Sequence, residues 1–98
     1  MRFGLTDQQF AFIDQKVVRP LAAKGAAVFC FGSRARGDHQ PFSDLDLMVE
    51  SSSKTDLNLE AIAEELSSSN FPLKVDLVHI LDFADSYKDS YLAERTPF

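Results

Sequence analysis

The chain of 98 residues carries 10 basic and 15 acidic side chains, a formal charge of −5, and a single cysteine. This length suits one domain, residues 1–98, with a core of its own, and one cysteine excludes a disulfide within the chain. The acidic balance argues against the wide basic surface of nucleic-acid-binding proteins, so direct nucleic-acid binding is not expected. No apolar run approaches the length of a membrane span and no signal-peptide pattern follows Met1, so we expect a cytoplasmic protein without membrane contact.

The first predicted helix begins with a capping box at Thr6–Gln9, in which Thr6 is the cap and Gln9 reaches back to it. Apolar residues then recur at helical spacing, at Phe10, Ile13, Val17 and Leu21. Pro20 falls inside this pattern, which predicts a kink or a break near Arg19, and Gly25 is placed to end the helix.

The next part of the chain alternates apolar runs with polar turns. Val28–Phe31 is apolar without interruption and predicts a buried strand. Ser33–Arg36 predicts a short helix, and Gly37–Ser43 predicts a loop because it is polar and rich in turn residues. Leu45–Val49 predicts a second strand.

Two carboxylates mark the start of this second strand. Successive side chains of a strand point to opposite faces, so Asp44 and Asp46 share a face about 6.6 Å apart along it, and Leu45 and Leu47 face the core. Neighbouring carboxylates repel unless a cation lies between them, and oxygen-only ligands favour Mg²⁺ or Mn²⁺ over zinc. The pattern therefore predicts a divalent metal site at Asp44 and Asp46.

A phosphate-binding turn is predicted just upstream. Gly32 allows the backbone to approach a ligand closely, and Ser33 offers a hydroxyl beside the first N–H groups of the short helix. Arg34 and Arg36 add cationic donors that can grip phosphate oxygens. Simpler roles stay open: Gly32 as a turn glycine, Ser33 as a helix cap, and either arginine in a surface ion pair, for instance with Asp38. We expect one arginine to face away from the site.

A further helix is predicted from an apolar stripe at Leu59, Ile62, Ala63 and Leu66. Thr55 or Asp56 is expected to cap this helix, and residues 70–72 to stop it. Asp82 is expected to cap a last helix that aligns Phe83, Tyr87 and Tyr91, before a frayed tail at residues 96–98.

The third predicted strand, Leu73–Ile80, carries Asp76 among apolar neighbours. A carboxylate there is costly unless it meets a metal ion or a positive charge, so Asp76 is the third candidate ligand. Pairing with Lys74 or an arginine is the structural alternative. His79 in the same strand is expected to be satisfied by the fold, His39 to be solvated in its loop, and Cys30 to be a small buried hydrophobe.

Gly32-Ser33, a ten-residue gap and Asp44-x-Asp46 together resemble the signature of the DNA polymerase beta-like nucleotidyltransferase superfamily. The fuller string FGSRARG…SDLDL is similar to its smallest branch, the minimal nucleotidyltransferases encoded beside HEPN-domain toxins. The resemblance covers nearly the whole chain. It implies an α/β (α+β) nucleotidyltransferase fold, a small mixed three-stranded sheet flanked by about four helices, with Asp76 on the strand beside the D-x-D strand.

The resemblance also implies a reaction, the transfer of AMP from ATP to an acceptor hydroxyl. Asp44, Asp46 and Asp76 would be the catalytic acids and would hold two Mg²⁺ ions, or Mn²⁺. Nucleotide-binding residues would be Gly32, Ser33, Arg34 and Arg36.

The acceptor that the resemblance implies is a tyrosine hydroxyl of a HEPN-domain toxin, a ribonuclease that this chain would silence as its antitoxin. A chain this short has no separate acceptor-binding domain, which favours a partner protein as acceptor. Two alternatives stay open. In one, the chain neutralises its partner by binding, with weak or lost catalysis. In the other, it is a nucleotidyltransferase for a small molecule or nucleic acid and acts with a separate specificity subunit.

Overall fold

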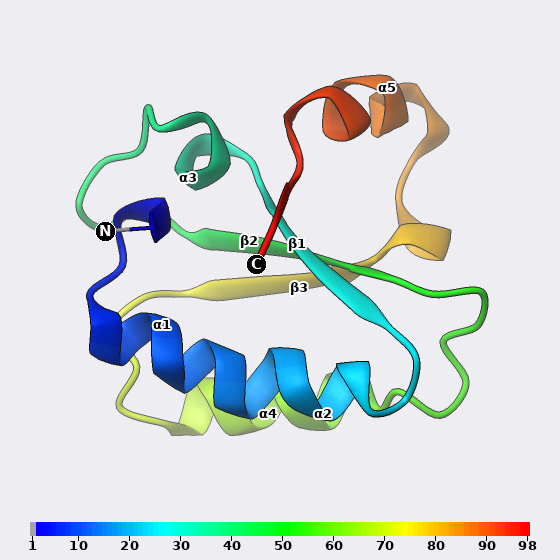
Figure 1. Cartoon of the computed structure of the whole chain (residues 1–98), viewed down its shortest axis with the longest axis horizontal. Coiled ribbons are helices and arrows are strands. Elements are labelled where there is room, and N and C mark those ends of the chain that lie inside the picture. The colour runs from blue at the N-terminus through cyan, green and yellow to red at the C-terminus, as the bar shows by residue number, and fades with distance from the viewer. Residues whose placement is uncertain (1) are drawn as a thin grey trace.

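The computed structural model describes residues 2–98. Its centre is a four-stranded sheet in the order β3-β2-β1-β4 (Figure 1). The strands are β1 (Ala27–Phe31), β2 (Leu45–Glu50), β3 (Val75–His79) and β4 (Thr96–Pro97). β1 runs antiparallel to its neighbours β2 and β4, whereas β2 and β3 are parallel. The predicted mixed α/β class is confirmed, with one strand more than the three expected.

Helices lie on both sides of this sheet (Figure 1). On one side are α1 (Asp7–Ile13), α2 (Arg19–Ala22) and α4 (Leu59–Ser68), and on the other are α3 (Ser33–Arg36) and α5 (Asp85–Glu94). A π-helical segment, η2 (Asp14–Val18), joins α1 to α2. Two 3₁₀ turns complete the secondary structure, η1 (Arg2–Gly4) and η3 (Ile80–Asp82). Across residues 2–98, no helix is both long and apolar enough to cross a lipid bilayer.

The main apolar core lies between the sheet and the α1, α2 and α4 layer. In β2 the side chains of Leu45, Leu47 and Val49 are fully buried in this core. Because side chains alternate along a strand, Asp46 and Glu50 point to the opposite face, where α3 and α5 lie. The predicted separation of carboxylates from core leucines in β2 is therefore confirmed.

The first helix forms as its sequence predicts. Thr6 and Gln9 make the capping box: the Gln9 N–H donates to Thr6 Oγ1 at 3.1 Å, and the Thr6 N–H donates to Gln9 Oε1 at 2.9 Å. Pro20 has no N–H to donate to the preceding turn, and the π-helical segment before Arg19 accommodates this. The helix therefore changes its hydrogen-bond pattern near Arg19 and continues to Ala22.

The expected frayed tail at Thr96–Phe98 is instead part of the fold. Thr96 and Pro97 pair with β1, and the Phe98 N–H donates to the Val28 carbonyl at 3.1 Å. The Phe98 ring stacks on Phe3 at 5.4 Å and on Phe10 at 4.5 Å between ring centroids. A two-residue strand that contains proline carries too little sequence pattern to be predicted.

Both predicted caps in the second half of the chain were wrong. α4 begins after Asn58, which adopts a left-handed conformation with φ 57°, because residues 54–57 form a turn that buries Leu57 instead of starting the helix. α5 begins after Ala84, because Asp82 ends the 3₁₀ turn that follows β3 and pairs with Lys54.

The aromatic stripe of the last helix is also only partly core. Phe83 precedes α5, and Tyr91 is buried against Phe31 and Phe83, with ring centroids 5.4 and 5.7 Å away. Tyr87 is 63% exposed. α5 therefore rests on the sheet through one buried side chain, Tyr91, and most of its surface faces solvent.

Candidate active site

Gly32 and Asp46 face each other in the predicted site. Phe31, the last residue of β1, pairs with Asp46 in the register of β1 and β2. Gly32 follows with φ 75° and ψ −157°, a conformation that is essentially restricted to glycine. A Cβ at this position would lie 2.5 Å from Oδ2 of Asp46. Both the turn and the facing carboxylate therefore require glycine at position 32.

α3 starts directly after this glycine, as predicted for the phosphate-binding turn. Ser33 is its first residue and directly follows Gly32 in the chain. The helix is a single turn that ends at Gly37, whose φ of 88° is left-handed. The N–H groups of Gly37 and Asp38 both donate to the Ser33 carbonyl, at 2.9 and 3.2 Å. These two hydrogen bonds close the turn after Ser33.

The three predicted acids lie at the same end of the sheet. Asp44 is exposed and immediately precedes β2, and Asp46 lies within β2. Asp46 and Asp76 are register partners in the parallel pair β2 and β3, so their side chains leave the same face of the sheet. Lys74 approaches Asp76 at 3.6 Å, but the two side chains are 72% and 41% exposed, so this ion pair is weak.

Crowding of these acids changes the protonation of Asp46. Burial, the charge of Asp76, a hydrogen bond to Asp76 and the charge of Asp44 together raise the pKa of Asp46 to about 6, and Arg36 acts in the opposite direction. The charged form of Asp46 is therefore disfavoured in the free protein. A proton shared with Asp76 or a bound cation would relieve the repulsion.

The chemistry of these donors fits a hard divalent cation, since all are carboxylate oxygens. In the free chain, however, no three His, Cys, Asp or Glu side chains of residues 2–98 converge closely enough to hold a metal ion. Coordination by Asp44, Asp46 and Asp76 together would thus require their side chains to move. Asp44 is exposed and lies outside the strand, so it is the most free to do so.

The two arginines have different environments. Arg34 is 3% exposed, and its guanidinium donates to the carbonyls of Phe3, Pro41 and Ser43 at 2.8, 3.2 and 3.0 Å. It therefore faces away from the acids and holds the loop that leads to Asp44. This removes Arg34 from the predicted nucleotide contacts, because its side chain is committed to backbone carbonyls.

Arg36 stays at the surface beside the site. Its Nε donates to Asp38 Oδ2 at 3.2 Å, and its Nη1 donates to Glu94 Oε2 at 3.2 Å. Arg36 also lowers the pKa of Asp46, which shows that its charge acts on the acids. The open alternative of a pairing with Asp38 is thus realised, together with a pairing that the sequence did not suggest.

The sequence reasoning missed the residues that hold α5 over the acid-bearing face. Glu50 leaves this face of β2 and accepts hydrogen bonds from Tyr91 and Arg95. The Arg95 guanidinium lies over the Phe29 ring, 4.5 Å from its centroid. The sequence signal was strand alternation, because Glu50 lies four positions after Asp46 in the same strand and so points to the same face.

Cys30 and His79 have the structural roles expected for them. Cys30 is fully buried, and burial is the main cause that raises the pKa of its thiol to about 12, so it is no nucleophile. His79 Nδ1 accepts from the Leu81 N–H at 3.0 Å, and Nε2 lies 2.8 Å from Ser51 Oγ. His39 differs from the expectation: it is half-buried against Gly4, and its Nδ1 is buried without a partner among the described residues.

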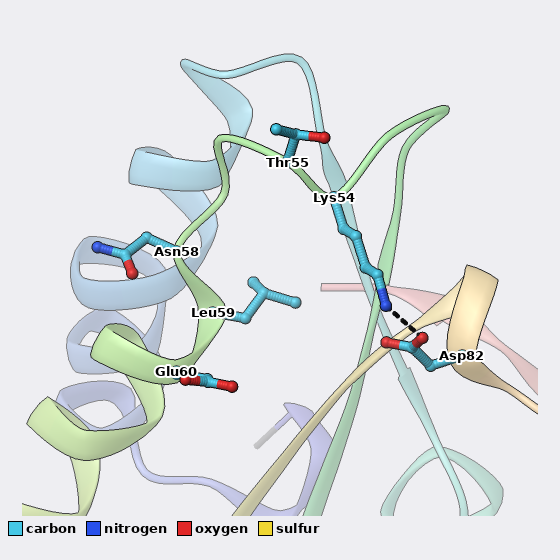
Figure 2. A pocket seen from close by; sticks show the side chains of 6 residues that line it. All are labelled: Lys54, Thr55, Asn58, Leu59, Glu60 and Asp82. Atoms are coloured by element: carbon cyan, nitrogen blue, oxygen red, sulfur yellow. Dashed lines mark hydrogen bonds and ion pairs between the residues drawn. The ribbon is translucent and has the colours of Figure 1, made fainter.

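A separate pocket of about 480 Å³ lies at the other ends of β2 and β3 (Figure 2). Six residues line it: Lys54, Thr55, Asn58, Leu59, Glu60 and Asp82. An ion pair of 2.5 Å between Lys54 and Asp82 spans it. Because it follows the carboxyl ends of both strands, it is not part of the site at Asp44, Asp46 and Asp76.

The family model for the nucleotidyltransferase domain matches residues 14–98, which include all seven predicted site residues. The chain belongs to the nucleotidyltransferase domain family. The candidate site at the start of β2 and β3 therefore lies inside the region that the family model matches.

Two further comparisons agree with this family. The chain is 40% identical over 63 residues to a protein named "Probable protein adenylyltransferase MntA" from Haemophilus influenzae. That match covers 63% of this chain and 53% of the relative, so the chain spans about half of the relative's length. A solved structure described as "Crystal structure of the toxin-antitoxin with AMP-PNP" aligns with a TM-score of 0.64 at 19% identity, over 95% of this chain and 72% of the other. This likeness shows a shared fold.

Proposed function

We propose that this nucleotidyltransferase transfers AMP from ATP to a hydroxyl group of a partner protein, and that the partner is a HEPN-domain toxin which this modification silences. The observation that carries the proposal is the pairing of Asp46 with Asp76 across β2 and β3. Gly32 lies next to this pair, at a position where a side chain would clash with Asp46. This arrangement places a crowded acidic pair beside a turn suited to phosphate. Support for the type of reaction comes from the name of the Haemophilus relative, a protein adenylyltransferase.

Support for the ligand and the partner comes from the structural neighbour, a toxin-antitoxin described with the ATP analogue AMP-PNP. The acidic surface of this chain also favours a protein acceptor over nucleic acid, because phosphates of a nucleic acid would be repelled by a charge of −5. A tyrosine hydroxyl is the acceptor that we propose.

The reaction forms a bond between the acceptor oxygen and the α-phosphorus of ATP and breaks the bond from that phosphorus to the bridging oxygen of pyrophosphate. Asp44, Asp46 and Asp76 would hold two Mg²⁺ ions, or Mn²⁺, which when bound neutralise the triphosphate and activate the attacking oxygen. Asp76 would accept the proton of the acceptor hydroxyl. Ser33 and the first N–H groups of α3 would orient the outgoing pyrophosphate.

The alternative function involves no transfer of AMP. A protein with this site could neutralise its partner by binding alone, with catalysis weak or absent. The two functions differ in whether the partner carries AMP after the complex forms.

The test is to co-express this chain with a HEPN-domain protein of the same genome and to determine the mass of that partner. The proposed function predicts a partner that carries one or more AMP groups on a hydroxyl, and an unmodified partner when the chain carries Asp46→Asn or Asp76→Asn. A tight complex with an unmodified partner would support neutralisation by binding. Label from α-³²P-ATP that appears in RNA or a small molecule instead of protein would identify a different acceptor class.

A further inference from the structure

Among residues 2–98, Arg36 is the one exposed cation that both belongs to the predicted phosphate-binding turn and is bound to another element of the fold. It ends α3, three residues after Ser33, and its Nη1 lies 3.2 and 3.5 Å from the two carboxylate oxygens of Glu94, the last residue of α5. Its Nε remains paired with Asp38. The Arg36–Glu94 pair therefore connects the two helices that lie on the acid-bearing side of the sheet (Figure 1).

The Arg36–Glu94 pair is only partly accessible to water. The side chains of Arg36 and Glu94 are 46% and 26% exposed, so a competing anion can reach the guanidinium. Tyr91 is the buried residue of α5. The Arg95–Glu50 ion pair also holds the end of α5, next to Glu94. Loss of the Arg36–Glu94 contact would therefore leave α5 attached.

We infer that Glu94 competes with the triphosphate for Arg36, so that nucleotide binding exchanges a carboxylate partner for phosphate oxygens on this guanidinium. The inference rests on the proposed function, because it assumes that the triphosphate binds at Ser33 and α3. One guanidinium edge cannot satisfy Glu94 and a phosphate group at the same time. Glu94 is then a positioning residue, which keeps Arg36 beside the acids in the free protein and weakens the apparent affinity for nucleotide.

The matched pair of variants is Glu94→Gln and Glu65→Gln. Each removes one negative charge from an ion pair, but Glu65 lies in α4 and pairs with Lys16 at 3.3 Å. α4 is on the opposite side of the sheet from α3 and α5 (Figure 1). The control therefore measures the general effect of the protein's net charge on the affinity for an anionic ligand. Arg36→Gln, alone and combined with Glu94→Gln, completes a double-mutant cycle.

The probe is AMP-PNP with Mg²⁺, titrated calorimetrically at low ionic strength. We expect Glu94→Gln to bind about two- to fivefold tighter than both the wild type and Glu65→Gln, the range typical of partly exposed ion pairs. In the Arg36→Gln background, Glu94→Gln should give no gain. Glu94→Ala serves as a second variant if circular dichroism shows that Glu94→Gln is not folded.

Three results would overturn the inference. Equal or weaker binding by both Glu94 variants would show that Glu94 does not compete, and with a wild type that binds AMP-PNP the proposed function would stand. A gain that persists in the Arg36→Gln background would place the effect of Glu94 elsewhere. Failure of the wild type and every variant to bind AMP-PNP would contradict the proposed function together with the inference.

Discussion

Gly32 and Asp46 are in contact across β1 and β2, so closely that a Cβ on residue 32 would lie 2.5 Å from the Asp46 carboxylate. The two residues belong to the two halves of the motif, which are separated by ten residues, 34–43, that include most of the short helix α3. Their contact fixes the phosphate-binding turn relative to the acids. It explains in physical terms why the motif needs glycine at this position, beyond the ability of glycine to turn the chain.

Gly32→Ala should therefore both destabilise the fold and weaken nucleotide binding. The backbone conformation alone costs about 1–3 kcal/mol for a residue with a side chain, and the new methyl group would displace Asp46. Chemical denaturation measures the first effect and AMP-PNP titration the second. Gly25→Ala is the control, because Gly25 also has a positive φ of 83° but a Cβ added there would meet no atom within 4 Å. Equal nucleotide affinity of the two variants would show that the Gly32–Asp46 contact does not contribute to nucleotide binding.

Asp46→Asn should stabilise the metal-free protein at neutral pH. The folded-state pKa of Asp46 is raised to about 6 from 3.8, so its ionised form costs stability above that pKa, and the cost fades as the pH falls toward 3.8. The melting temperature in EDTA should be higher for Asp46→Asn than for the wild type at pH 7, and the difference should shrink toward pH 4.

Asp89→Asn, which removes an exposed carboxylate on α5, is the control for this measurement. A lower melting temperature for Asp46→Asn than for the wild type at pH 7 would show that the acids stabilise the free fold and are not crowded.

Arg34→Met should unfold the site, whereas Arg36→Met should not. Arg34 is buried, and its loss leaves the carbonyls of Phe3, Pro41 and Ser43 without their donor, which we expect to cost at least about 2 kcal/mol. Arg36 is exposed, so its substitution should change stability little and affect mainly nucleotide affinity. Urea unfolding of both variants checks this contrast. Equal stability losses would mean that Arg34 does not hold the loop.

His79 should make stability fall in mildly acidic solution. Burial is the main cause that lowers its pKa below the usual 6.5. Both ring nitrogens have partners, the Leu81 N–H at Nδ1 and Ser51 Oγ at Nε2. The neutral ring is favoured in the folded state, so its contribution is present above pH 6.5 and is lost as the pH falls below that value. Ionisation of Asp46 lowers stability as the pH rises, which opposes the effect of His79. The urea midpoint should therefore be followed from pH 8 to 5 in the Asp46→Asn background. His79→Gln should flatten that dependence, and an unchanged slope would refute the assignment to His79.

Sequence reasoning located the features that depend on neighbouring residues. The alternation of Leu45, Asp46 and Leu47 predicted which face of β2 carries the acid, and the capping box at Thr6–Gln9 predicted where α1 begins. Both features follow from local geometry alone. The pairing of Asp46 with Asp76 needed the family resemblance, because strand order is not written in a local pattern.

Contacts between distant residues were not predictable in the same way. Arg34 and Arg36 are chemically identical and two positions apart, and only the packed fold distinguishes the buried loop anchor from the surface cation. The partner of Arg36, Glu94, lies 58 residues away and belongs to no motif. The caps expected at Thr55 or Asp56 and at Asp82 failed because tertiary contacts of Leu57 and Lys54 override local capping preference.

The assignment of the triphosphate site is decided by calorimetric titration of the wild type and of the Asp44→Asn/Asp46→Asn variant with AMP-PNP, each with and without Mg²⁺. A nucleotidyltransferase site built on these acids predicts binding that requires Mg²⁺ and is lost in the double variant, while circular dichroism shows both proteins folded. Binding of equal strength in the two proteins, or binding indifferent to Mg²⁺, would place the triphosphate away from Asp44 and Asp46 and refute the assignment.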